Sequence, residues 1–222
     1  MQLAVELASP VTTLALIGGG EFSFGDTREI DALLVARMPA DRRTIAFLPT
    51  ASGSAEYAVH LGAYFRELDP SVDVINVPVY RGRDNRRLKN VNSVLGAGMI
   101  YLGGGVTNNL LDTLRGSPVE IAMRDAAENG AIVAAIGAAA SSFGVWARDM
   151  RGGSALAGLG WLSRTVVETS FDPQNDTMLR RLMSQPDVSL GLGIPPKTAL
   201  LVDRSGAGTI AGEGQIAAFR KQ

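Results

Sequence analysis

The side chains best placed to do chemistry lie in one short segment that follows an apolar run. Residues 132–136 are apolar and lead through Gly137 into small residues that end in Ser141 and Ser142. An apolar strand followed by a tight turn and a helix is the setting of a nucleophile elbow, in which one reactive side chain is lifted clear of the sheet. The tip predicted here is Ala139, whose methyl group cannot attack a carbonyl carbon.

Other sources of catalytic chemistry are few. The chain has no cysteine, which excludes disulfides, thiolate metal sites and a cysteine nucleophile. Its single histidine, His60, shares one helix face with Tyr57 and Tyr64, so we expect a surface helix residue rather than a base. Residues 18–20 lack the glycine spacing of a dinucleotide loop, and residues 103–105 lack the Lys-Ser/Thr ending of a phosphate loop. We therefore predict no cofactor and no metal.

Composition indicates one globular domain, residues 1–222, with 46% hydrophobic residues and a formal net charge of −1. This charge gives no reason to expect nucleic acid or an anionic membrane as a partner. No run reaches the roughly 18 apolar residues that a spanning helix needs, and residues 1–10 lack a basic stretch before an apolar core. We expect a cytoplasmic protein, and a homodimer is left open.

Strand-like and helix-like segments alternate along the chain. Strands are predicted at residues 11–17, 44–48, 72–79, 99–102, 132–136, 166–168 and 198–202, with a terminal hairpin from residues 209–211 and 215–219. Helices are predicted around residues 26–38, 55–68, 90–95, 110–114, 118–129 and 177–183. The alternation, and strands that are apolar throughout, favour a mostly parallel sheet covered by helices on both faces.

Three glycine-rich turns fall where predicted strands end. They are residues 18–20, residues 103–105 and Gly137. In an open parallel sheet the ligand crevice lies at the carboxyl ends of the strands. We therefore predict that the three turns converge on one pocket.

Several blocks of the chain together resemble one peptidase family. They are residues 16–21 (LIGGGE), 47–52 (FLPTAS), 101–111 (YLGGGVTNNLL), 158–162 (GLGWL) and 197–202 (KTALLV). In order and spacing they are similar to the dipeptidase E and cyanophycinase family of serine peptidases, over residues 11–219. The resemblance implies a single three-layer α/β domain with the class I glutamine amidotransferase-like (flavodoxin-like) fold, which agrees with the pattern of strands and helices.

The resemblance also assigns catalytic positions. Active members carry Gly-x-Ser-Ala-Gly at the elbow, and laying this motif on residues 137–141 puts Ala139 at the nucleophilic serine and Ser141 at the final glycine. The family's Asp-x-His-Phe segment matches residues 168–171, so the position of the catalytic histidine holds Ser170. Two members of the triad are therefore predicted to be substituted.

The third member of the triad has no clear counterpart. The family carries its acidic residue between the positions of Ala139 and Gly158, where Asp149 is too close to the turn to be assigned. A hydroxyl without a base within hydrogen-bonding reach is a poor nucleophile. The expected result is a loss of hydrolysis.

A binding pocket is nevertheless expected to remain. Backbone N–H groups of Gly104 or Gly105, together with that of Ala140, are predicted to form an oxyanion site at the start of a helix. Glu21 and Asn108 follow glycine turns and are predicted to line the pocket. A small peptide, an amino acid or another small carboxylate is the expected ligand.

Three hypotheses follow from the sequence. The preferred one is a catalytically inactive homologue of the dipeptidase E and cyanophycinase family that keeps its pocket or serves as a structural subunit. The second is an active hydrolase of acidic dipeptides or a related amide, with Ser141 as a displaced nucleophile beside Glu168 or His60. The third is an interaction module without a small ligand, which predicts a filled or collapsed pocket.

Overall fold

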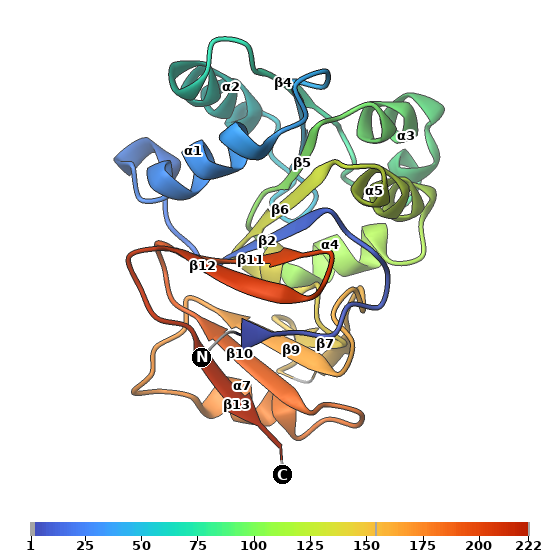
Figure 1. Ribbon diagram of the computed structural model, residues 1–222. Coiled ribbons are helices and arrows are strands. Elements are labelled where there is room, and N and C mark those ends of the chain that lie inside the picture. The colour runs from blue at the N-terminus through green and yellow to red at the C-terminus, as the bar shows by residue number, and fades with distance from the viewer. Residues whose placement is uncertain (1–2, 154, 222) are drawn as a thin grey trace.

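The computed structural model describes residues 3–153 and 155–221 and is built around an eight-stranded sheet (Figure 1). Across the sheet the strands are β1 (Leu3–Ala4), β12 (Ala207–Gly212), β11 (Thr198–Asp203), β2 (Thr13–Ile17), β6 (Ile132–Ile136), β5 (Met99–Leu102), β3 (Thr44–Leu48) and β4 (Asp73–Asn76). Five neighbouring strands are parallel to one another: β2, β6, β5, β3 and β4. The remaining strands, β11, β12 and β1, pair antiparallel. Residues 1, 2, 154 and 222 of the predicted domain lie outside the described residues.

Helices cover both faces of the sheet (Figure 1). On one face, Ala15 and Ile17 of β2 pack in one core with α1 (Arg28–Arg37) and α2 (Glu56–Leu68). On the other face, Leu14 and Leu16 share a second core with α3 (Leu88–Leu95), α4 (Thr107–Leu114) and α5 (Pro118–Glu128). Because successive strand residues point to opposite faces, a strand buried on both sides must be apolar throughout. The predicted three-layer α/β architecture is confirmed.

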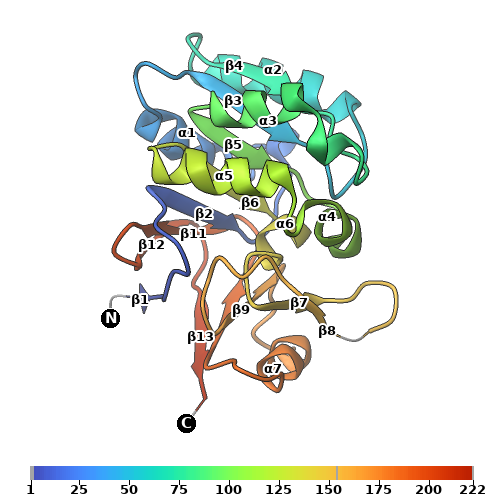
Figure 2. The same cartoon turned by 90° about the vertical axis from the view of Figure 1, so that its right-hand side faces the viewer.

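A smaller three-stranded sheet lies beyond the antiparallel side of the central sheet (Figure 2). Its order is β13 (Ala217–Arg220), β10 (Leu190–Ile194) and β9 (Thr165–Thr169), and α7 (Thr177–Met183) packs on it. A hairpin of β7 (Trp146–Arg148) and β8 (Ala155–Ala157) adjoins α7.

The predicted terminal hairpin is wrong. Strand β12 pairs with β11 and β1, whereas β13 pairs with β10 in the smaller sheet. An open strand edge presents unpaired N–H and C=O groups and is best covered by another strand. Here β12 covers the edge at β11 in the central sheet, and β13 covers the edge at β10 in the smaller sheet. The last two strands therefore do not pair with each other.

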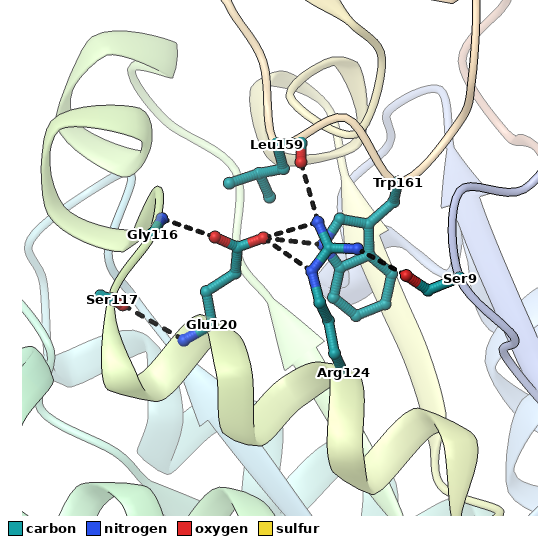
Figure 3. Close-up of polar contacts among 7 residues, drawn as sticks. All are labelled: Ser9, Gly116, Ser117, Glu120, Arg124, Leu159 and Trp161. Carbon is teal, nitrogen blue, oxygen red and sulfur yellow. Dashed lines mark hydrogen bonds and ion pairs between the residues drawn. The ribbon is translucent and has the colours of Figure 1, made fainter.

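A buried ion pair ties the start of α5 to residues 158–162 (Figure 3). Ser117 caps α5, and its Oγ accepts from the N–H of Glu120 at 3.2 Å. The Glu120 side chain is only 6% exposed and accepts from the Arg124 guanidinium at 2.8 Å, from Trp161 Nε1 at 3.1 Å and from the N–H of Gly116 at 2.7 Å. The guanidinium also lies over the Trp161 ring, 4.7 Å from its centroid. This contact set holds the GLGWL block in place.

The same block supports the short helix that follows β6. The Trp161 ring meets Phe143 edge to face at 5.1 Å. The N–H of Leu159 donates to the carbonyl of Ser142 at 2.7 Å, and the N–H of Trp161 donates to the carbonyl of Phe143 at 3.0 Å. The ion pair therefore stabilises the segment just after the predicted elbow.

One carboxyl group on α1, that of Asp31, is fully buried. The Oδ2 atom of Asp31 accepts from Thr27 Oγ1 at 2.6 Å and from the Tyr64 hydroxyl at 2.8 Å, whereas Oδ1 has no partner in the described part of the chain. Burial raises the pKa of Asp31 from 3.8 to about 6, and the hydrogen bonds from Thr27 and Tyr64 oppose this shift.

The raised pKa of Asp31 predicts that this residue makes the protein less stable as the pH rises. Folding takes up a proton at a carboxyl whose folded pKa lies above its unfolded value, so its contribution is complete below about pH 4 and is lost through about pH 6. The free energy of unfolding should fall by about 3 kcal/mol on this account. Asp31→Asn should remove that part of the pH dependence, as urea unfolding at pH 4 and pH 7.5 would measure. Asp41→Asn, at an exposed position, is the control. An unchanged difference between the two pH values in Asp31→Asn would contradict the assignment.

Candidate functional site

A cavity of about 310 Å³ lies at the carboxyl ends of the parallel strands. Because β6 lies between β2 and β5, its turn lies between the two triglycine loops. Five glycines contribute backbone to the wall: Gly19, Gly20, Gly103, Gly104 and Gly137. Five other residues complete it: Glu21, Phe47, Ser52, Tyr57 and Ile136. The predicted convergence of the glycine turns is confirmed.

The tip of the turn is Gly137. It follows β6 directly and has φ 58° and ψ −125°, a conformation that residues with a side chain rarely adopt. Its N–H donates to the carbonyl of Ile17 at 2.9 Å, and its carbonyl accepts from the N–H of Ser141 at 3.1 Å. The chain therefore leaves the sheet and enters α6 (Ala138–Ser141) within one residue, beside α4 (Figure 2).

The prediction that Ala139 occupies the tip is wrong. Ala139 is the second residue of α6, and its side chain is completely buried in the core. The ladder between β2 and β6 ends at the pair Ile17 and Ile136, and this pairing decides where the turn begins. The turn therefore lies two residues earlier than the motif alignment placed it.

The space beside the tip is open. A Cβ built on Gly137 would meet no heavy atom within 4 Å. At Gly105, by contrast, a Cβ would lie 2.5 Å from the backbone of Ala51, so this glycine packs against the loop after β3. Of the two glycines predicted to supply oxyanion donors, only Gly104 lies on the cavity wall.

Ser170 lies on the other side of the end of β2. It follows β9 with φ 50°, is exposed, and donates its N–H to the carbonyl of Gly18 at 2.7 Å and its hydroxyl to the same oxygen at 3.4 Å. Gly137 binds the neighbouring carbonyl, that of Ile17. The two positions therefore bind successive carbonyls at the end of β2, and Gly137 has no side chain.

The predicted displaced nucleophile is not assembled. The hydroxyls of Ser141 and Ser142 both donate to the carbonyl of Ala138, at 2.9 and 2.8 Å, and both residues are buried. His60 is exposed on α2 and lines a separate open hollow. Glu168 lies two residues before Ser170, and its burial raises its pKa. Neither Ser141 nor Ser142 lies on the cavity wall.

Asn108, a predicted pocket residue, has a structural role together with Asp149. Asn108 donates from Nδ2 to Asp149 Oδ1 at 2.8 Å and accepts from the N–H of Met150 at 3.0 Å, which fixes the loop after β7. The hydrogen bond from Asn108 lowers the pKa of Asp149, as do the N–H groups of Arg151 and Gly152. Neither Asn108 nor Asp149 reaches the cavity.

Ala140, predicted as the second oxyanion donor, is buried inside α6. Glu21, in contrast, lines the cavity as predicted. Its carboxylate accepts from the Tyr57 hydroxyl at 3.0 and 3.3 Å. Burial, followed by the negative charge of Glu21, raises the pKa of Tyr57, so its hydroxyl remains a donor.

Sequence reasoning missed Tyr57, Ser52 and Phe47 as wall residues. Tyr57 was assigned to a helix face, and the other two belong to the FLPTAS block whose side chains were given no role. The block lies at the carboxyl end of β3. Because ligands bind at the carboxyl ends of parallel strands, this position could have identified the block as part of the cavity wall.

In residues 3–153 and 155–221, no group of three histidine, aspartate or glutamate side chains is arranged to hold a metal ion. No described helix combines the length and the apolar character needed to cross a bilayer.

The sequence profile of peptidase family S51 matches residues 14–210. Among curated proteins, the chain is 32% identical over 128 residues to the uncharacterized peptidase YgaJ of Bacillus subtilis (strain 168). That match covers 56% of this chain and about half, 53%, of the relative's length.

Two solved structures share the fold. A peptidase from an acI-B1 actinobacterium superposes with a TM-score of 0.79 at 23% identity, over 95% of this chain and 91% of that one. A putative peptidase E protein from Listeria monocytogenes EGD-e gives a TM-score of 0.56 at 14% identity, over 96% and 100%. At these identities the likeness establishes the α/β architecture alone.

Proposed function

Because the chain belongs to peptidase family S51 while the tip of its turn has no side chain, we propose that it is a catalytically inactive relative of dipeptidase E and cyanophycinase that retains a ligand cavity. The conformation of Gly137 carries the proposal. In a nucleophile elbow the reactive residue occupies the strained position between strand and helix, and here that position holds glycine.

The chemistry that remains is too weak for hydrolysis. Removing the nucleophile or the base of a serine protease triad lowers kcat by about a million-fold. In this chain Gly137 offers no side-chain oxygen, and Ser170 offers no imidazole nitrogen. Both losses affect proton transfer and attack, whereas substrate binding does not depend on them.

A modified oxyanion site supports binding. The residue after the tip supplies the first donor in such sites, and with Gly137 at the tip that residue is Ala138 rather than Ala140. A helix start leaves its first N–H groups without intrahelical acceptors. Gly104 lies against the carbonyl of Ile136 on the same wall. A peptide carbonyl or carboxylate is the complementary group, and 310 Å³ suits an amino acid or dipeptide.

Covalent labelling tests the loss of catalysis. After incubation with a fluorophosphonate probe, the intact mass of the protein is expected to be unchanged, because the buried hydroxyls of Ser141 and Ser142 bind the carbonyl of Ala138. Trypsin under the same conditions is the positive control. Stoichiometric modification of Ser141, Ser142 or Ser170 would show an active serine and contradict the proposal.

A thermal-shift screen tests the binding. Dipeptides and amino acids are expected to raise Tm, because a ligand that binds only the folded state stabilises it by mass action. At 100 times Kd the gain is about 2.7 kcal/mol. If no dipeptide or amino acid shifts Tm at millimolar concentration, the retained cavity does not serve small peptides.

A further inference from the structure

The Glu21 carboxylate is the one charged group on the wall of the elbow cavity within the described residues. The other wall side chains are Phe47, Ser52, Tyr57 and Ile136, and the rest of the wall is glycine backbone. A ligand that enters this cavity must therefore satisfy a carboxylate.

No cation of the described chain pairs with Glu21. Its neighbour Asp26, on the same loop, forms an ion pair with Lys197 at 2.8 Å and also accepts from the N–H of Glu21 at 3.1 Å. Glu21 itself accepts hydrogen bonds from Tyr57 and from the N–H of Ser23, at 3.4 Å, but it makes no ion pair in residues 3–153 and 155–221.

Tyr57 holds the carboxylate in place. Its ring packs edge to face on Phe22 at 5.0 Å and stacks on Phe47 at 6.0 Å, which fixes the hydroxyl that binds Glu21. The carboxylate is thus oriented before a ligand arrives, and preorganisation reduces the entropy lost on binding.

Glu21 and Tyr57 also form the border of a second, open hollow of about 700 Å³. Phe22, Phe24 and Glu67 line this hollow together with Arg28 and His60, and Phe24 is 84% exposed. Aromatic faces beside a carboxylate are a favourable environment for an organic cation. The charged group of a ligand can therefore meet Glu21 at the junction of the two spaces.

We propose that Glu21 selects the ligand by pairing with a positively charged amine, either a free peptide amino terminus or the ammonium of a lysine side chain. The inference rests on the proposed binding function and names its ligand class. A carboxylate that loses water on binding costs free energy unless a cation pairs with it. Neutral or purely anionic ligands should therefore be excluded from this end of the cavity.

Isothermal titration calorimetry with three ligands tests this. Alanyl-alanine carries a free amino terminus, N-acetyl-alanyl-lysine carries only a side-chain ammonium, and N-acetyl-alanyl-alanine carries neither. At least one of the first two should bind the wild type about tenfold or more tightly than the third. Which of the two binds identifies the source of the amine.

The variants are Glu21→Gln and, as a matched control, Glu67→Gln, which changes the same group on the outer hollow only. The amide oxygen introduced by Glu21→Gln still offers the Tyr57 hydroxyl an acceptor, so the fold should be kept, which Tm would verify. Glu21→Gln should weaken binding of the cationic ligand about tenfold or more and leave binding of N-acetyl-alanyl-alanine unchanged. Glu67→Gln should leave the binding of both unchanged.

Two outcomes would overturn the inference in distinguishable ways. If the cationic ligand binds Glu21→Gln as tightly as the wild type, or if N-acetyl-alanyl-alanine binds the wild type as tightly as both cationic ligands, the cavity binds peptides without the proposed cation site. If none of the three ligands binds the wild type, the proposed peptide-binding function itself fails.

Discussion

The double variant Gly137→Ser and Ser170→His is expected to react with a fluorophosphonate probe at residue 137, whereas the wild type is not. The tip has the strained backbone of a nucleophile position, and a side chain there meets no atom within 4 Å. Histidine is among the residues that tolerate the φ of 50° found at position 170. The rate of labelling should exceed that of Gly137→Ser alone by about 10³-fold or more, as measured by intact mass against time.

Two matched variants test whether the serine needs the imidazole and whether it must stand at position 137. Gly137→Ser alone should label far more slowly, because its hydroxyl has no imidazole to take the proton. Ala139→Ser with Ser170→His places the serine where the motif alignment put it, but that side chain is buried in α6 and should not label. Labelling of the second pair instead of the first would contradict the assignment of the tip. A folded Gly137→Ser and Ser170→His variant that stays unlabelled would show that the two positions do not meet.

Replacing Glu120 by alanine is expected to cause the largest loss of stability. The change leaves Arg124, whose side chain is 27% exposed, without its partner and removes the acceptor of Trp161 Nε1 and of the Gly116 N–H. Removing one member of a buried pair costs about 3–5 kcal/mol, and the partial exposure of Arg124 places this case near the lower end, at about 3 kcal/mol. For a chain of this length Tm should fall by roughly 10 °C. Urea unfolding and a thermal melt would measure both.

Glu120→Ala with Arg124→Ala should cost less than the sum of the two single changes, because the double variant buries no unpaired charge. Arg66→Ala, which breaks an ion pair with both side chains more than half exposed, should cost less than about 1 kcal/mol. Additive losses in the double variant would contradict the idea that Glu120 and Arg124 act as a pair.

Much of the central architecture follows from the order of residues. The apolar runs at residues 13–17, 44–48, 99–102 and 132–136 contain few polar side chains, so only a strand covered on both faces suits them. The glycine turns after three of these strands predicted the place of the cavity. Both signals are local, and both were confirmed.

The sequence alone decided that the chain has no cysteine chemistry, that the turn carries no serine nucleophile and that position 170 carries no histidine. Only the tertiary structure decided where the turn begins. The run Gly-Ala-Ala-Ala-Ser-Ser has no side chain that marks the first helical residue, and the end of the ladder between Ile17 and Ile136 makes Gly137 the tip. Likewise, the partners of β12 and β13 depend on which sheet edges remain open. Lys197, too, pairs with Asp26 from a distant part of the chain. These are contacts between distant segments, which spacing along the chain does not encode.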